Sequence, residues 1–472
     1  MAAKESARRK KPCDIIIRNG YLVTVDKRRT IYATGAIAIT GDRIAAVGRE
    51  RDVLAAWEAK RIFDAQGAVV HPGFIDAHVH VVHGTCRGVF DSSLTAGRLT
   101  FADWKADVTD EDEFDATSLA SIEALRRGFT GFVEPGSIFE PDAAAKAAEA
   151  VGVRALLAGC YLWDNTDAMK YLGALDSKRL YRRAPGRSRH AIDQLGSQLY
   201  RNKDKNALVR GYVSVYGLAT ASDELEIAAK KLAAKHKVPF HQHEAYIPDA
   251  TAADTKALGT SRLRHLAEIG VLDRNASFVH MTALDAADER VVKKTGISIV
   301  WCPHAYMQHA GFKYHSRIPR MYKGGVNVTL GTDGTMDAAI GDAGYAAYYV
   351  AAGLGEPITA GDVVEMQSIR AAKVAGLDGE VGSLEAGKRA DIVIRAPNVA
   401  ESYPAVNPLH HLALMGNSGN VDTVLVNGQV VWRGGRSTRV DEERVFARAK
   451  ASVERRMKRL GLKPAVGWPV VR

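Results

Sequence analysis

The ten residues His71-Pro-Gly-Phe-Ile-Asp-Ala-His-Val-His80 decide how this chain is expected to fold. The apolar run that starts at Gly73 predicts a short buried strand, and this strand ends on His78 and His80. Residues i and i+2 of a strand point to the same face, so both imidazoles can reach one metal ion. The stretch therefore predicts a strand that delivers two metal ligands at its carboxyl end.

Seven further apolar runs follow, at intervals that leave room for helices. A helical pattern such as that of residues 223–234 lies between two of them. Strands that alternate with helices indicate a parallel sheet, and eight strands are the number that closes a (β/α)₈ barrel. We therefore expect an α/β fold, a TIM-like (β/α)₈ barrel with strands at 73–80, 128–136, 153–162, 209–217, 238–244, 276–280, 297–304 and 326–334.

Strand-rich segments flank the barrel on both sides. Turn signals at Asn19-Gly20, Gly41-Asp42 and Asn427-Gly428 separate short apolar runs near the two ends of the chain. We expect these segments to build one small β-sandwich domain together. The predicted division is a basic tail (1–13), a composite sandwich (14–69 and 376–440), the catalytic barrel (70–375, with a loop-rich insertion at 163–207) and a C-terminal helix and tail (441–472).

The composition excludes several classes of protein. The chain has 472 residues, of which 46% are hydrophobic and 25% charged, as in ordinary globular proteins. Its apolar runs are far shorter than the roughly 20 residues of a membrane span, so we expect no membrane association. The net charge of +10 is concentrated in 1–12, 178–210 and 441–472, so no basic face for nucleic acid is predicted. The four cysteines form no C-x-x-C pair, which favours a reducing cytoplasm.

Three more of the expected strands end on groups that bind metals or move protons. The fifth ends His241-Gln242-His243-Glu244, where alternation places both histidines on one face, and Glu244 on the other unless the strand has already ended. The sixth ends on His280 and the eighth on Asp333. Barrel active sites lie at the carboxyl ends of strands, so these groups are expected to converge. Spacing alone leaves open which fifth-strand histidine binds a metal.

Together with GSLEAGKRADIVI at 382–394, these motifs make the chain similar to the amidohydrolase superfamily from about residue 14 to 435. Within it, the chain most resembles the mononuclear branch of cytosine, guanine and S-adenosylhomocysteine deaminases and triazine chlorohydrolases. The resemblance implies a metal site and three catalytic residues that handle protons. The implied ligands are His78, His80, His241 and Asp333, and the implied catalytic residues are Glu244, His280 and Asp333, which leaves His243 outside the ligand set.

The resemblance also implies the cofactor. Three imidazoles and a carboxylate suit one divalent ion, with Zn²⁺ expected first and Fe²⁺ or Mn²⁺ as alternatives. Binuclear members carry a carbamylated lysine at the end of the fourth strand, whereas residues 209–219 of this chain contain no lysine. A single ion is therefore expected. Since relatives assemble from identical subunits, we also expect a homo-oligomer.

The expected chemistry follows from the ion. A divalent metal lowers the pKa of bound water to about 7, which supplies a nucleophile at neutral pH. We therefore expect attack of activated water on an sp² carbon of a small nitrogen heterocycle or aromatic amine, with hydrolytic deamination as the leading hypothesis. The alternative is hydrolysis of an amide C–N bond, or displacement of chloride or an alkylamine, at the same site.

The loop after the seventh strand departs from the family pattern. Relatives show a Cys-Pro-x-Ser-Asn run there, whereas Cys302-Pro303 is followed here by imidazole and aromatic groups. These groups favour a planar substrate that carries an anionic group. The candidate substrate-binding residues are His83, Arg87, Trp163, His304, Tyr306 and His309.

Overall fold

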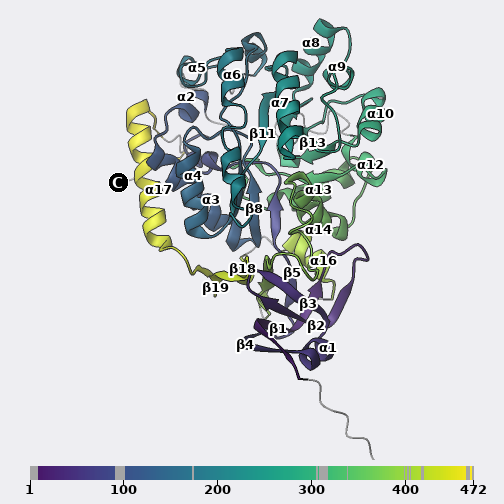
Figure 1. Cartoon of the computed structure of the whole chain (residues 1–472). Helices are drawn as coiled ribbons and strands as arrows, with labels where there is room; N and C mark the ends of the chain where they lie inside the picture. The colour runs from purple at the N-terminus through teal and green to yellow at the C-terminus, as the bar shows by residue number, and fades with distance from the viewer. Residues whose placement is uncertain are drawn as a thin grey trace, which may run out of the picture.

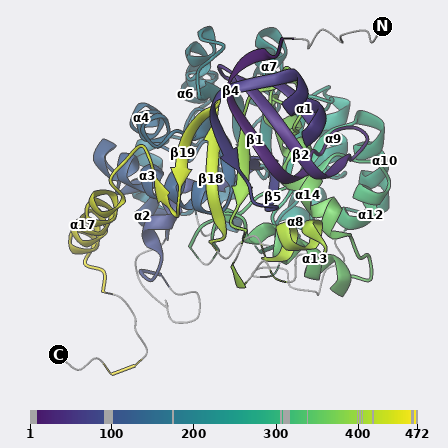
Figure 2. The same cartoon turned by 90° about the horizontal axis from the view of Figure 1, so that it is seen from below.

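The computed structural model describes residues 9–90, 101–172, 175–304, 307, 317–336, 338–397, 399–400, 403, 406–415, 419–463 and 468–469. Figure 1 shows a large body of strands surrounded by helices, with a smaller strand-rich part below it. The smaller part contains both the first strands of the chain and strands from near its end. The view from below shows β1, β2, β18 and β19 crossing the base of the larger body (Figure 2).

All eight strands expected in the larger body are present, and they pair in parallel. The first, fourth and eighth are each split into two short segments. The bounds are β6 (Phe74–Asp76) and β7 (Val79–His80), β8 (Phe129–Val133), β9 (Arg154–Leu157), β10 (Val209–Gly211) and β11 (Val213–Gly217), β12 (Phe240–Glu244), β13 (Ala276–His280), β14 (Ser298–Trp301), and β15 (Val328–Leu330) and β16 (Asp333–Gly334). Parallel pairing brings the carboxyl ends of neighbouring strands to one edge.

The parallel strands form ladders in the order β10-β9-β8-β6 and β11-β12-β13-β14-β15, while β16 pairs with β7. Single backbone hydrogen bonds connect the ladders. The N–H of Ala77 donates to the carbonyl of Leu330 at 3.0 Å, and that of Tyr212 donates to the carbonyl of Leu157 at 3.1 Å. These bonds place the end of the first strand directly beside the end of the eighth, where His78 and Asp333 lie.

Helices follow the strands, as the alternation predicted. Residues 223–234, expected to be helical, lie in α7 (Asp223–His236), which Ser222 caps. The other helices of the larger body and the C-terminal segment are α2 (Phe101–Ala106), α3 (Asp110–Arg126), α4 (Pro141–Val151), α8 (Pro248–Leu258), α9 (Arg262–Glu268), α10 (Ala286–Thr295), α12 (Ile318–Lys323), α13 (Asp342–Gly353), α14 (Ala360–Gln367), α15 (Ile369–Val374), α16 (Pro408–His410), a π-helical turn η7 (His411–Met415) and α17 (Glu442–Leu460), with a 3₁₀ turn η1 (Val81–Cys86) directly after β7.

The two ends of the chain contribute to a single nine-stranded sheet, in the order β20-β19-β18-β17-β5-β1-β2-β3, with β4 paired to β1. Its elements are β1 (Lys11–Val23), β2 (Ile31–Thr40), β3 (Arg43–Arg49), β4 (Trp57–Asp64), β5 (Val69–Pro72), β17 (Ile392–Arg395), β18 (Val421–Val426), β19 (Gln429–Arg433) and β20 (Arg436–Ser437), with α1 (Glu50–Ala56) between β3 and β4. The sheet includes β5, so it continues past residue 69, where the domain boundary was expected.

The signal at Asn19-Gly20 was expected to mark a turn, but β1 runs straight through it. Asn19 has φ 52°, and the pairing of β1 with β2 shifts register on both sides of Gly20. The left-handed residue is therefore absorbed as an irregularity within the strand. The signals at Gly41-Asp42 and Asn427-Gly428 do form the turns between β2 and β3 and between β18 and β19.

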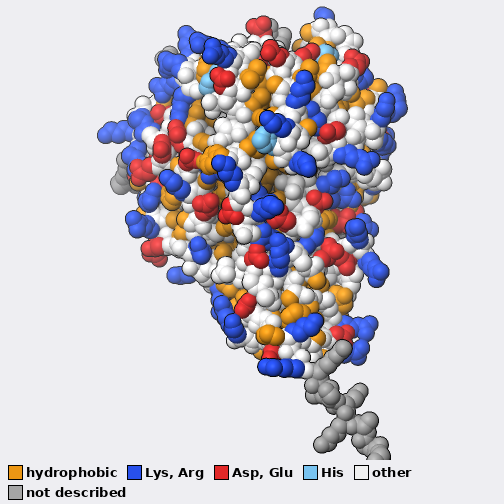
Figure 3. Space-filling view, in the orientation of Figure 1, with side chains coloured by type: hydrophobic (Ala, Val, Ile, Leu, Met, Phe, Trp, Pro, Cys, Tyr) orange, Lys and Arg blue, Asp and Glu red, His pale blue; other side chains and the backbone are white. Residues whose placement is uncertain are grey.

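The insertion at 163–207 contains more regular structure than the sequence indicated. It includes η2 (Thr166–Tyr171), α5 (Lys178–Arg183), α6 (Ser188–Gln194) and η4 (Leu199–Lys203). On the face of the molecule in Figure 3, basic side chains are interspersed with acidic ones. Among the helices of the described residues, none is long and apolar enough to span a membrane.

Candidate metal centre and active site

His78 and His80 lie at the carboxyl end of the first barrel strand, and both are buried. The strand is interrupted between β6 and β7, and Asp76 stabilises the interruption. Its Oδ1 accepts the backbone N–H groups of His78 and Thr332, each at 3.1 Å. Burial raises the pKa of Asp76 to about 7, although the bonds from Thr332 and His78 oppose the rise. Asp76 therefore ties the first strand to the residue that precedes Asp333.

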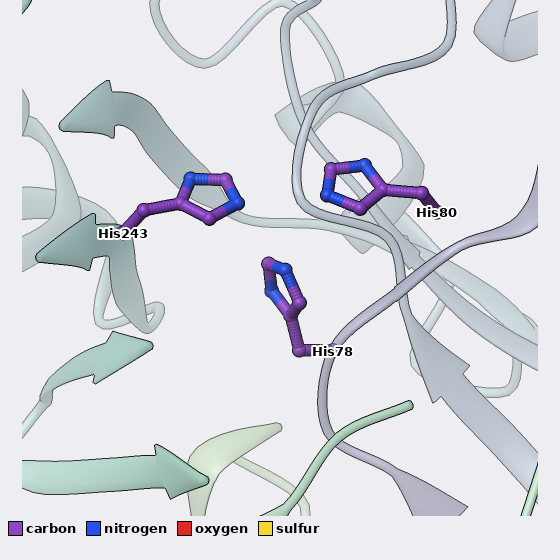
Figure 4. A group of neighbouring side chains, drawn as sticks. All are labelled: His78, His80 and His243. Carbon is purple, nitrogen blue, oxygen red and sulfur yellow. The ribbon is translucent and has the colours of Figure 1, made fainter. Parts of the chain in front are cut away.

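The fifth strand, β12, contributes the third imidazole of the cluster through His243. Its Nδ1 donates to the carbonyl oxygen of Tyr216 at 2.8 Å, so Nε2 carries the lone pair. Ligand nitrogens of His78, His80 and His243 lie within 4.8 Å of one another. Figure 4 shows the three rings turned toward a shared space. These buried rings, from two strands, surround a position for one cation.

His80 is oriented by a buried carboxylate that acts through a serine. Nδ1 of His80 lies 2.9 Å from Oγ of Ser137, and this hydroxyl donates to Oε1 of Glu134. Because the hydroxyl donates to Glu134, it accepts from His80, which leaves the lone pair of His80 on Nε2. Burial raises the pKa of Glu134 to about 7 against the bonds from Ser137 and Gly136. Outer partners of this kind fix the tautomer of metal-binding histidines.

His241 lies one pleat deeper in β12 than His243 and contacts the cluster only from behind. Its Nδ1 is 2.7 Å from Oγ of Ser277, which donates to the carbonyl of Phe240 at 3.4 Å. His241 therefore donates to Ser277, and its Nε2 accepts from Nδ1 of His78 at 3.0 Å. The group of three imidazoles within 4.8 Å of one another therefore contains His243, whereas the resemblance implied His241 as the ligand from this strand. His241 lies two residues earlier in β12 than His243, and it contacts this group through His78.

Asp333 completes the cluster from β16. Its backbone is left-handed, with φ 64°, and its N–H donates to the carbonyl of His78 at 2.8 Å. Oδ1 lies 3.4 Å from Nε2 of His80 and 3.7 Å from Nε2 of His78. Burial raises the pKa of Asp333, but His78 and His80 outweigh burial and hold that pKa well below its usual range. An ionised carboxylate therefore faces the imidazole nitrogens.

The three imidazoles are neutral, which makes them competent ligands. Burial lowers the pKa of His78 and of His80 to about 4, and that of His243 to about 3. Nε2 of His78 and of His243 has no hydrogen-bond partner among the described residues. Buried lone pairs that face a carboxylate are costly unless a cation or a proton lies between them. The donor set of three imidazoles and one carboxylate fits a divalent transition-metal ion.

Glu244 is not brought to the cluster. Because β12 continues to Glu244, alternation turns its side chain to the face opposite His243. Its Oε1 accepts the N–H of Ala245 at 2.9 Å, and the charged groups that act on it are Arg262 and Asp254. Burial raises the pKa of Glu244 to about 7. The sequence predicted this direction for the Glu244 side chain only if the strand continues to residue 244, and β12 does.

His280 does face the cluster, together with two residues that the sequence did not single out as functional. His280 ends β13 with φ 73°, and its ring stacks between those of Tyr246, at 3.8 Å, and His243, at 5.6 Å. Ligand atoms of His280, Cys302 and Asp333 lie within 4.8 Å of one another. Nδ1 of His280 has no partner among the described residues. Tyr246 gave no signal in the sequence, because it follows the strand in a stretch without a motif.

The candidate substrate residues lie in different surroundings. His83 is buried and stacks on His80 at 4.6 Å, and its ring nitrogens have no partner among the described residues. Arg87 is engaged by both oxygens of Glu123, at 2.7 and 3.1 Å. Trp163 is fully buried and donates to the carbonyl of Ala184 at 2.9 Å, so its ring packs in the core. His304 is half-buried just after β14. Tyr306 and His309 lie outside the described residues.

A family model matches most of this chain. Residues 69–431 match the model of the amidohydrolase family. This chain belongs to that family, and its parallel strands with surrounding helices form a TIM-barrel-type α/β fold.

Individual relatives extend across nearly the whole chain. A 5-methylthioadenosine/S-adenosylhomocysteine deaminase of Desulforudis audaxviator is 29% identical over 93% of this chain and 98% of its own. A 5'-deoxyadenosine deaminase of Methanosarcina mazei is 27% identical over 93% and 98%.

Solved structures show the same fold at lower identity. An adenosine deaminase from Xanthomonas campestris with bound zinc superposes with a TM-score of 0.80 at 23% identity, covering 95% of this chain and 100% of its own. Atrazine chlorohydrolase from Arthrobacter aurescens, complexed with zinc, gives 0.76 at 22% identity, covering 93% and 100%.

Proposed function

We propose that this chain is a metal-dependent aminohydrolase, which replaces an amino group on a nitrogen heterocycle by oxygen from water and releases ammonia. The observation that carries the proposal is that Nε2 of His78 and of His80 faces the carboxylate of Asp333, while a ring nitrogen of His243 lies within 4.8 Å of those of His78 and His80. In each imidazole the other nitrogen is engaged by an outer partner. Such preorganisation is typical of a metal site.

We infer one Zn²⁺ as the ion, with Fe²⁺ or Mn²⁺ as alternatives, held by His78, His80, His243 and Asp333. Zinc is favoured by the imidazole-rich donor set and by the bound zinc of the two solved relatives. When bound, such an ion lowers the pKa of water to about 7 and stabilises negative charge on the attacked carbon's substituent. The four side chains would hold the ion at the carboxyl ends of the barrel strands, so the reaction is expected to take place there.

The proton transfers fall to groups that face the cluster. Asp333 is ionised and lies beside the imidazoles, so its carboxylate can take a proton from the attacking water. A ring nitrogen of His280 lies within 4.8 Å of Asp333 and Cys302, so His280 can hydrogen-bond the substrate atom that gains charge. Glu244 has no part in this proposal, since its carboxylate lies on the other face of β12.

The substrate class follows from the named relatives and the ring-lined wall of the site. The curated relatives are deaminases of adenine nucleosides and their thioether derivatives. Here the exposed parts of Tyr246 and His304 lie at the ends of β12 and β14, where a planar base can stack. We therefore propose an aminated purine or related heterocycle as the substrate.

We also propose that the two ladders close into one barrel, that the terminal sheet forms a separate β-sandwich domain and that the protein is a homo-oligomer.

The test is ammonia release by protein of measured metal content. The panel contains adenosine, 5'-deoxyadenosine, 5'-methylthioadenosine and S-adenosylhomocysteine, together with aminated pterins and triazines, a chlorinated triazine and an amide. We expect ammonia and an equal amount of the oxo product from at least one amine, and loss of both after chelation. Turnover of a chlorinated or amide substrate in the same panel, without ammonia from any amine, would contradict the proposal.

A further inference from the structure

Helix α17 is the last helix of the chain, and it lies beyond the residues that match the family model. Figure 1 shows it running along the side of the larger body, beside α2 and α3. Three of its apolar side chains, those of Val453, Met457 and Leu460, pack in one cluster with Cys86 of η1 and Trp104 of α2. The helix therefore covers the two short elements that follow β7 in the chain.

Arg456 is the α17 side chain that bonds to these two elements, and only 1% of the residue is exposed. Its guanidinium makes three hydrogen bonds to the covered segments: Nε to the carbonyl of Asp107 at 2.8 Å, one Nη to the carbonyl of Trp104 at 2.7 Å, and the other to Oγ1 of Thr85 at 3.2 Å. The guanidinium also lies 3.8 Å from the centre of the Trp104 ring. One cation thus connects η1 to α2.

The two connected elements form one wall of the metal site. His83 of η1 stacks on His80 with ring centres 4.6 Å apart, and Phe101 of α2 meets the edge of His83 at 4.7 Å. The ammonium of Lys105 lies 4.5 Å from the centre of the Phe101 ring. A continuous series of contacts therefore leads from the C-terminal helix to His80.

We propose that Arg456 is a positioning residue, which holds η1 and α2 together so that His83 keeps His80 oriented toward the metal ion. The proposal rests on the metal site of the proposed function, but it does not depend on which substrate is used. The guanidinium fits this task because its planar fork makes several bonds in fixed directions, whereas an apolar side chain would hold only one surface. Through this contact a segment far from β7 in the sequence determines how firmly the ion is held.

The experiment compares Arg456→Met with Arg448→Met. Arg448 lies on the same helix and pairs with Asp115 of α3 at 2.8 Å, so its loss weakens the docking of α17 without touching η1 or α2. We expect Arg456→Met to transfer its metal to a chelator about tenfold faster than the parent protein, and Arg448→Met to match the parent. Arg456→Lys, which keeps a cation near Trp104, is expected to be intermediate.

Hydrogen exchange supplies a second readout that needs neither metal nor substrate. Peptides covering 81–86 and 101–107 should exchange faster in Arg456→Met than in Arg448→Met. Equal metal release and equal exchange in the two variants would overturn the proposal, since α17 would then only add stability. If Arg456→Met does not fold, Thr85→Val removes one acceptor of the guanidinium, and unchanged metal release in that variant would overturn the proposal as well. A parent protein that binds no divalent metal would refute the proposed function, and the exchange comparison would still test Arg456.

Discussion

Two strands of this protein end in the same pattern of histidine, one residue, histidine, and they use it differently. Both His78 and His80 of the first strand belong to the group of imidazoles within 4.8 Å of one another, whereas the fifth strand contributes His243 to it. The first strand is interrupted between β6 and β7, where Asp76 accepts the N–H groups of His78 and Thr332. Strand β12 is unbroken, so its two histidines lie one pleat apart. We infer that an identical pattern supplies two metal ligands in one strand, and one ligand and one supporting residue in the other.

We expect the greatest loss of metal and activity when a metal ligand of the first barrel strand is replaced. His80→Asn should leave the protein folded but without its metal, and ammonia release should fall to background, because Nε2 of His80 faces Asp333 directly. Metal analysis and the ammonia assay measure both effects. His265→Asn is the control, since His265 pairs with Asp223 away from the site. Full metal content in His80→Asn would show that the first strand does not supply two ligands.

A smaller change is expected from removing an outer partner of His80. Ser137→Ala leaves Nδ1 of His80 without its acceptor, and metal affinity should fall by about 10- to 100-fold. A competition titration with a chromophoric chelator measures the affinity. Ser452→Ala is a matched control, because it removes a buried serine bond to Asp112, at 2.7 Å, outside the site. Equal affinities in the two variants would mean that Ser137 does not orient the ligand.

The smallest change is expected from replacing Glu244, whose side chain lies on the face of β12 opposite His243. Burial raises the pKa of Glu244 to about 7, above its unfolded value, so the folded state binds an extra proton and loses stability as pH rises from about 4.5 to 7. Glu244→Gln removes that loss, and above pH 7 the variant should be more stable by about 3 kcal/mol or less. Its metal content should stay unchanged. Urea unfolding between pH 5 and 8 measures the difference in unfolding free energy between the variant and the parent protein. A difference that does not change with pH would contradict this prediction.

Much of this fold could be predicted from the sequence, because each barrel strand is a short apolar run bounded by turn residues and followed by a helical pattern. The gathering of His78, His80, His280 and Asp333 at one edge could also be predicted, since each lies at the end of such a run. What could not be predicted depends on side-chain depth and direction. No spacing rule distinguishes His241 from His243, and the direction of Glu244 depends on whether the strand continues for one more residue.

Two further features needed the folded structure for the same reason. Asn19-Gly20 resembles a hairpin turn in the sequence, but the pairing of β1 with β2 continues on both sides of it and keeps the strand intact. Trp163 was expected to stack on a substrate, but its indole lies in a core cluster with Tyr161 and donates to the carbonyl of Ala184. Such outcomes depend on neighbours that are distant in the sequence.

The comparison of His243→Ala with His241→Ala decides between the two histidines of β12. Each purified variant is titrated with Co²⁺, whose visible absorption reports the number and kind of ligands, and its zinc content is measured. We predict that His243→Ala binds no stoichiometric metal, whereas His241→Ala retains one ion with affinity lowered by about 10- to 100-fold, because His241 only orients His78. Retention of a tightly bound ion in His243→Ala, together with its loss in His241→Ala, would contradict the metal centre described here.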